Sequence, residues 1–84
     1  MYLSLLQVDA SGRMGQTWLA NPYRVHQRLL MAFPDGQSGR VLFRIEADRD
    51  PPRILVQAPV PANWARGFDN LPVLLAQVQK PVAL

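Results

Sequence analysis

Residues 21–33, NPYRVHQRLLMAF, carry the signals of one amphipathic helix, and the rest of the chain can be placed around it. Asn21 suits the capping position, and Pro22 suits the first helical position, where a missing N–H costs nothing. The sequence PDG that follows residue 33 favours a stop. We therefore predict a helix over residues 22–33.

One side of this helix is apolar when its residues are placed at about 100° per residue. The apolar side consists of Val25, Leu29, Ala32 and Phe33, with Leu30 at its edge. His26, the only histidine in the chain, and Tyr23 fall on the border between the apolar and polar sides. At such a border, packing holds the base of a ring while its edge stays accessible, which suits a reactive side chain.

Length and composition limit what the chain can be. Its 84 residues allow one small domain, and 49% hydrophobic residues are enough for a core. Without cysteine it has no disulfide or thiolate metal site, and a single histidine without clustered carboxylates offers no other metal set. No apolar run approaches the roughly 20 residues that span a membrane. We expect a cytoplasmic protein without a metal or a membrane segment.

The basic residues are mostly arginines. The formal net charge is +3, and eight of the nine basic residues are arginines. The arginine fork matches the geometry of phosphate groups and stacks on bases. A charge of this size points only weakly to nucleic acid, and a mildly basic soluble domain fits it about equally well.

Three further segments have the pattern of strands. Residues 2–8 are leucine-rich, residues 41–47 alternate well, and residues 53–58 follow after a short turn, which favours an antiparallel hairpin. Residues 9–16 contain two glycines and predict a loop. Because a helix follows the first strand, we expect that strand to pair in parallel with a later one.

The order of these elements predicts an α+β domain built on a ferredoxin-like (RRM-like) βαββ unit. Residues 71–80 fit either a short helix or an extended segment, because periodicity cannot decide over so few residues. Only residues 81–84 follow, which are too few for a closing strand. We therefore expect a single N-terminal ferredoxin-like domain over residues 1–84, incomplete at its C-terminus.

Five blocks of the chain resemble, in the same order, the CasE family, the CRISPR-associated endoribonucleases of type I-E systems. The blocks are MYLSLL (1–6), NPYRVHQRLLMAFPDG (21–36), VLFRIE (41–46), ILVQAP (54–59) and NWARG (63–67). The second block is the most specific, and the resemblance becomes loose beyond about Phe68. Five blocks in order are much stronger support than one.

The resemblance implies two ferredoxin-like domains in tandem and metal-independent cutting of the repeat hairpin in precursor CRISPR RNA. It implies CRISPR repeat RNA and the other subunits of the Cascade complex as partners, and no cofactor. Family members are more than twice this long, so the second domain has no counterpart here. The chain therefore looks like an N-terminal piece, which we expect to be inactive without a complementing C-terminal half.

The resemblance places His26 at the family's catalytic histidine and Tyr23 at its catalytic tyrosine. In cleavage without metal, the 2′-hydroxyl attacks the adjacent phosphate, and the departing 5′-oxygen must receive a proton. A histidine, with an ordinary pKa near 6.5, can transfer that proton near neutral pH. Spacing of three residues puts both rings on one side of a helix. From the residues alone, His26 fits a half-buried core histidine better, and Tyr23 fits a packing residue.

Further side chains are candidates for RNA contact. They are Arg13, Arg24, Arg28, Arg66 and Trp64. For Arg24 and Arg28 a solvated helix face is the simpler interpretation. Trp64 could stack on a base, but a tryptophan after a hairpin is more often a plug that closes one end of the core.

Three functions remain open from the sequence. The first is an N-terminal segment of the endoribonuclease, and the second is a non-catalytic remnant that binds RNA or Cascade. The third is a small ferredoxin-like module that associates with itself to cover an open sheet edge. An enzyme requires His26, whereas an RNA binder tolerates its loss but weakens with salt.

Overall fold

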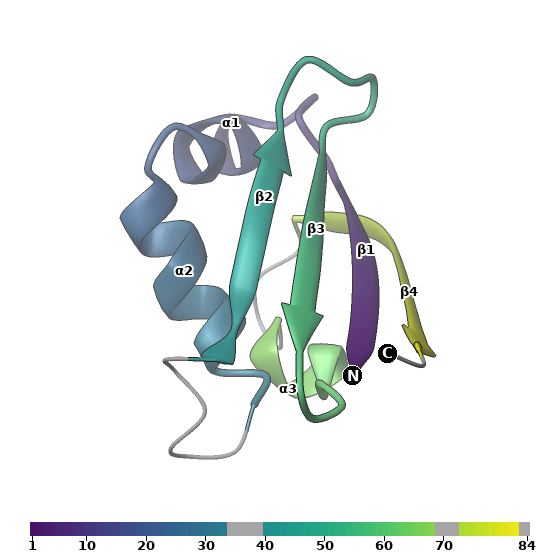
Figure 1. The fold of residues 1–84 in the computed structure, drawn as a ribbon. Coiled ribbons are helices and arrows are strands. Elements are labelled where there is room, and N and C mark those ends of the chain that lie inside the picture. The colour runs from purple at the N-terminus through teal and green to yellow at the C-terminus, as the bar shows by residue number, and fades with distance from the viewer. Residues whose placement is uncertain (34–39, 69–72, 83–84) are drawn as a thin grey trace.

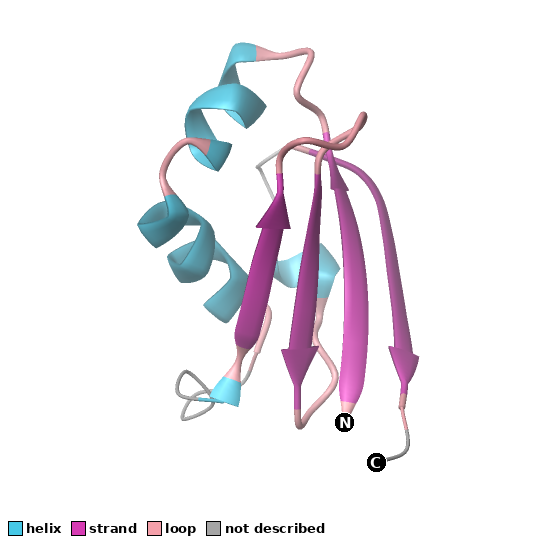
Figure 2. Ribbon diagram, turned by 45° about the horizontal axis from the view of Figure 1, so that its top comes forward, coloured by secondary structure: helices cyan, strands magenta, loops and turns pink. Residues whose placement is uncertain are grey.

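The computed structural model describes residues 1–33, 40–68 and 73–82. In chain order the elements are β1 (Tyr2–Val8), α1 (Arg13–Leu19), α2 (Pro22–Leu30), β2 (Leu42–Glu46), β3 (Arg53–Ala58), α3 (Trp64–Gly67) and β4 (Leu74–Pro81) (Figure 1). The helices lie on one face of a four-stranded antiparallel sheet (Figure 2). The chain is thus of the predicted α+β class.

The sheet has the strand order β2-β3-β1-β4, and every neighbouring pair is antiparallel. Leu5 of β1 lies opposite Leu55 of β3 on one side and opposite Val78 of β4 on the other. The expectation that the first strand pairs in parallel is wrong, because β3 is inserted between β1 and β2. The predicted antiparallel hairpin of β2 and β3 is confirmed.

The expectation that the chain ends before a closing strand is also wrong. Of the two conformations left open for residues 71–80, the extended one occurs in β4, which runs to Pro81. Its register with β1 extends from Tyr2 opposite Pro81 to Val8 opposite Leu74, with one irregularity beside Val8. The backbone groups of β1 supply the hydrogen-bond partners of β4. The sequence of β4 alone does not reveal this pairing.

The core forms between the helices and one face of the sheet. Its buried apolar residues include Leu6, Val8, Val25, Leu29, Ala32, Phe33, Ile54 and Val56. The predicted apolar side of the helix is therefore confirmed. The helix itself ends at Leu30 rather than at residue 33, because the N–H groups of residues 31–33 bond to carbonyls three residues back, which tightens the last turn.

Two short helices occur where the sequence predicted irregular structure. α1 occupies part of the expected loop, and α3 is a single turn capped by the side chain of Asn63, which accepts from the N–H of Arg66 at 3.1 Å. Of the two glycines that favoured a loop, Gly12 precedes α1, and Gly15 is tolerated inside it for a packing reason. Gly15 is buried against the backbone of Asp9, so a tertiary contact overrides low helix propensity there.

Replacing Gly15 with alanine is expected to lower the free energy of unfolding by about 1–3 kcal/mol, the usual cost of overpacking. A methyl group at this position would overlap the carbonyl oxygen of Asp9, and backbone yields less readily than a side chain. Gly12 is the matched control, because a Cβ there meets nothing within 4 Å. Gly12→Ala should change stability by less than about 1 kcal/mol. Urea denaturation of both variants measures this, and equal midpoints would contradict the assigned contact.

Candidate functional site

The start of α2 fixes where its functional side chains point. Pro22 occupies the first turn, and the side-chain oxygen of Asn21 accepts a hydrogen bond from the N–H of Arg24 at 3.3 Å. This is the helix start predicted from the sequence. It places Tyr23 in the first turn and His26 close to one turn later.

His26 is half-buried at the side of α2 that faces β2. Its ring stacks on the ring of Phe43, with 5.3 Å between the centroids and 18° between the planes. Stacking uses the face of the imidazole and does not involve the two nitrogens at its edge. The structure therefore gives His26 the border position expected from the sequence.

Tyr23 lies further out than expected. Its side chain is 69% exposed, so it stands in solvent rather than at the core border. Its hydroxyl oxygen accepts a hydrogen bond from Nε2 of Gln27 at 3.2 Å. Since this bond uses a lone pair of the oxygen, the hydroxyl hydrogen stays free to donate to another group.

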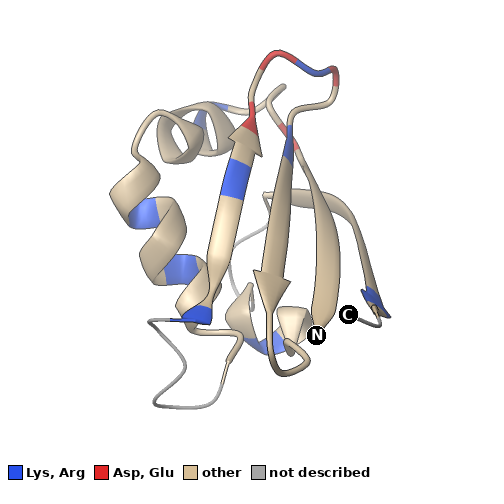
Figure 3. Cartoon of the chain, in the orientation of Figure 1, with Lys and Arg blue, Asp and Glu red and all other residues tan. Residues whose placement is uncertain are grey.

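A basic groove runs along the outer surfaces of α1 and α2. It has a volume of about 1190 Å³ and contains Arg13, Arg24 and Arg28. Its other lining residues are Met14, Thr17, Trp18, Gln27, Leu30 and Met31. Neither helix contains an acidic residue, so the groove is positively charged, as Figure 3 shows for the ribbon of both helices. Gln27 belongs both to this groove and to the hydrogen bond with Tyr23.

The other two RNA-contact candidates lie in α3. Arg66 is exposed, and its neighbour Trp64 is only 5% exposed. The indole N–H of Trp64 donates to Oγ of Ser4 at 3.0 Å, and its ring packs edge-on against Phe33. This position assigns Trp64 to the core, as the plug that the sequence offered as the alternative to base stacking. Arg28 also reaches α3, where it donates to the carbonyl of Gly67 at 3.3 Å.

The β2–β3 turn carries charges of both signs. Its acidic residues lie on either side of Arg49, as the red and blue segments of Figure 3 show. There the guanidinium of Arg53 hydrogen-bonds to Glu46 and lowers the pKa of that carboxyl, while Arg44 is 4.0 Å from it. The pair therefore contributes to the stability of the folded chain at pH values above the ordinary carboxyl pKa. This contribution is lost as the pH falls through the lowered pKa of Glu46.

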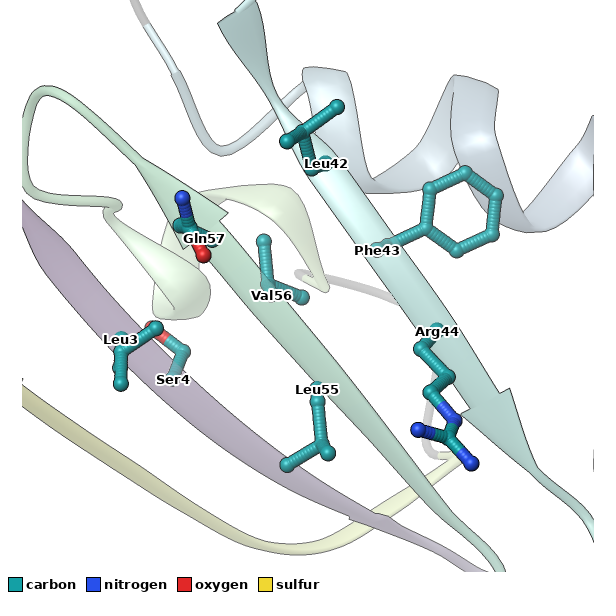
Figure 4. A pocket seen from close by; sticks show the side chains of 8 residues that line it. All are labelled: Leu3, Ser4, Leu42, Phe43, Arg44, Leu55, Val56 and Gln57. Carbon is teal, nitrogen blue, oxygen red and sulfur yellow. The ribbon is translucent and has the colours of Figure 1, made fainter.

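The face of the sheet opposite the helices is uncovered in the described part of the chain. Leu3, Leu42 and Leu55 are exposed there and, with Arg44, line part of a shallow hollow of about 310 Å³ (Figure 4). The lining of this hollow contains none of the predicted site residues. The candidate chemistry and the uncovered sheet face thus belong to different sides of the molecule.

Residues 1–33, 40–68 and 73–82 offer neither a metal cluster nor a membrane-spanning helix. No group of three or more histidine, cysteine or acidic side chains there is placed to hold a metal ion. No helix of that part is long and apolar enough to cross a membrane.

Sequence reasoning missed two contacts of the candidate site. Gln27 follows Tyr23 by four residues, so helix spacing could have indicated their hydrogen bond. Phe43 belongs to the alternating segment 41–47, and nothing in the strand pattern names His26 as its neighbour. That contact depends on how α2 crosses β2, which is a tertiary property.

Comparison with known proteins supports the resemblance. A family model described as "CRISPR associated protein" matches residues 1–82, and the chain belongs to this family. A search of curated protein sequences finds no match.

Solved structures match almost the whole chain. The Cse3 CRISPR endoribonuclease bound to a 19-nucleotide RNA has a TM-score of 0.81 and 30% identity, over 99% of this chain and 41% of that one. A CRISPR-associated protein from Thermus thermophilus has a TM-score of 0.82 and 29% identity, over 100% and 46%. Thermus thermophilus Cse3 bound to an RNA representing a pre-cleavage complex has a TM-score of 0.74 and 28% identity, over 99% and 43%. The chain spans less than half the length of each.

Proposed function

We propose that this chain forms the N-terminal, catalytic-helix portion of a metal-independent endoribonuclease that cuts the repeat hairpin of precursor CRISPR RNA. The observation that carries this proposal is the structural match to a Cse3 endoribonuclease with RNA bound, a match that covers 99% of this chain. The position of His26, half-buried with its ring edge free of the stack on Phe43, supports it.

In the proposed reaction, the 2′-hydroxyl attacks the adjacent phosphorus, and the bond to the 5′-oxygen breaks as the new P–O bond forms. The products are a 2′,3′-cyclic phosphate and a 5′-hydroxyl. His26 gives the departing 5′-oxygen its proton, and the proton of the attacking 2′-hydroxyl is released to water. The free hydroxyl hydrogen of Tyr23 donates to a non-bridging phosphate oxygen, with Gln27 holding the tyrosine oxygen from the other side.

We further propose that the domain is the first of two ferredoxin-like domains. Its antiparallel strand order β2-β3-β1-β4 with helices on one face supports this. The coverage of only 41–46% of the matched chains supports a second part of similar size. On this proposal, the chain cuts RNA only together with the remaining part, as one subunit of Cascade.

Cleavage of CRISPR repeat RNA in EDTA tests the proposed function. We expect no cutting by the chain alone, and cutting at the hairpin base by a chimera in which its residues 1–82 replace the matching part of the Cse3 that was solved with RNA. A substrate with a 2′-deoxy nucleotide at the cut site should stay intact. A chimera that folds and binds the RNA but never cuts it would contradict the catalytic proposal.

The basic groove is proposed to hold RNA phosphates. Replacing both Arg13 and Arg24 with alanine should weaken binding of repeat RNA to the chimera by a similar factor for different sequences. It should also reduce the slope of log K against log salt by about 0.7–0.9 for each phosphate group that the groove no longer binds. Fluorescence anisotropy over a salt series measures both quantities.

Arg44→Ala is the matched control for Arg24→Ala alone. Each removes one exposed arginine, but Arg44, with 77% of its side chain accessible, lies on the uncovered face of the sheet. We expect the affinity and salt slope of Arg44→Ala to equal those of the unmodified chimera. Equal weakening by both substitutions would mean that overall charge, and not the groove, governs binding.

A non-catalytic RNA-binding or Cascade-interacting role is the second candidate, and the groove with three arginines favours it. In that case the chain binds RNA with salt-dependent affinity and does not cleave it. His26→Ala then leaves RNA binding unchanged. A self-associating module is the third, favoured by the uncovered apolar sheet face, and a mass above that of one chain in RNA-free solution would support it.

A further inference from the structure

The ring orientation of His26 needs a physical cause, because α2 alone fixes only its Cβ. Catalytic histidines are commonly oriented by a carboxylate or carbonyl that accepts from one ring nitrogen. Within the described residues, no hydrogen bond to the His26 side chain occurs, and the contact that defines its ring plane is the stack on Phe43. An aromatic face therefore takes the place of a hydrogen-bonding partner.

Phe43 is held well enough to orient another ring. It lies in β2 opposite Val56 of β3, and its side chain packs half-buried against the core. In Figure 4 its ring projects from β2 toward the helix, while Leu42 and Arg44 flank the hollow. The strand register thus fixes the plane against which the imidazole lies.

We infer that Phe43 is the positioning residue for His26: it sets the plane of the imidazole so that the ring edge, with its nitrogens, faces the RNA. This role rests on the proposed function. A flat aromatic face restricts rotation about the Cβ–Cγ bond of histidine without consuming either nitrogen.

The effect on catalysis should be one of geometry. Phe43→Leu retains an apolar side chain but removes the plane, so the proton donor spends less time aligned with the 5′-oxygen. Misplacement by about 1 Å can cost about 10²-fold in rate. We therefore expect kcat for RNA cleavage to fall by up to about 10²-fold in the chimera, with KM nearly unchanged. Phe43→Trp, which restores an aromatic face, should recover most of the rate.

Proton NMR of the whole chain without RNA tests the contact separately. His26 is the only histidine, so its ring protons are assigned without ambiguity. The stack predicts ring-current-shifted resonances that move toward free-histidine positions in Phe43→Leu and stay shifted in Phe43→Trp. Phe43→Met, which also lacks a flat face, replaces Phe43→Leu if that variant fails to fold.

Phe33→Leu is the control, because it removes another core aromatic that packs on Trp64 instead of on His26. Unchanged histidine resonances in Phe43→Leu, or an equal change in Phe33→Leu, would overturn the inference. So would an unchanged kcat where the resonances do move. If the chimera with Phe43 never cuts RNA, the proposed function fails, while the NMR comparison still decides whether Phe43 orients the ring.

Discussion

Replacing His26 with alanine should lower the rate of RNA cleavage by the chimera about 10²–10⁴-fold, the range that a positioned proton donor contributes. The single histidine is the side chain in the site suited to protonate the departing 5′-oxygen near neutral pH. RNA affinity should change little, because the phosphate contacts that we propose come from arginines elsewhere on the helices. Single-turnover cleavage in EDTA separates the rate from the affinity.

His26→Gln separates chemistry from packing. Glutamine retains a polar side chain of similar reach but cannot carry a proton to the leaving oxygen. It should therefore be as inactive as His26→Ala, while its unfolding midpoint stays closer to that of the unmodified protein. Retention of cleavage by His26→Gln would exclude His26 as the proton donor.

Trp64→Ala should remove a large part of the free energy of unfolding. Removal of a buried tryptophan costs about 3–5 kcal/mol, and a domain of this size has about 5–15 kcal/mol in total. The loss is large because Trp64 also donates to Ser4, leaving that buried hydroxyl with one fewer partner. Urea denaturation followed by circular dichroism measures the change.

Trp64→Phe is the matched variant. It retains an aromatic ring beside Phe33 but loses the N–H, so we expect a cost of about 1–3 kcal/mol from the lost hydrogen bond to Ser4 and the smaller ring. The ranking in stability should be unmodified, Trp64→Phe, then Trp64→Ala. Equal midpoints for all three would contradict the assignment of Trp64 to the core.

Local pattern was sufficient where one element presents one face to the core. Alternation gave β3 with its bounds at Arg53 and Ala58, and helical spacing gave the buried side of α2 around Val25 and Leu29. The start of α2 followed from Asn21, whose side chain makes the capping bond within its own turn. These features depend on residues close together in the chain.

The sequence pattern did not predict the structure where contacts between residues distant in the chain determine it. Gly15 lowers helix propensity, yet α1 forms around it because that position has to pass the backbone of Asp9 closely. β4 could not be predicted with certainty because its partner is β1, and because Gln79 fits there by pairing with both backbone groups of Ala62. For the candidate site, the residue types came from the sequence, but the stack of His26 on Phe43 required the crossing of helix and strand.

The aromatic cluster has a practical consequence. Phe68 contacts both tryptophans of the chain, with centroid separations of 5.6 Å to Trp18 and 6.1 Å to Trp64. Because both indoles are buried, intrinsic emission should be blue-shifted in the folded chain and should report the docking of α1 and α3 on the sheet. His26 stacks outside this cluster, on Phe43. The chain therefore carries its own optical reporter of folding, in which Trp64 lies outside the basic groove while Trp18 lines it.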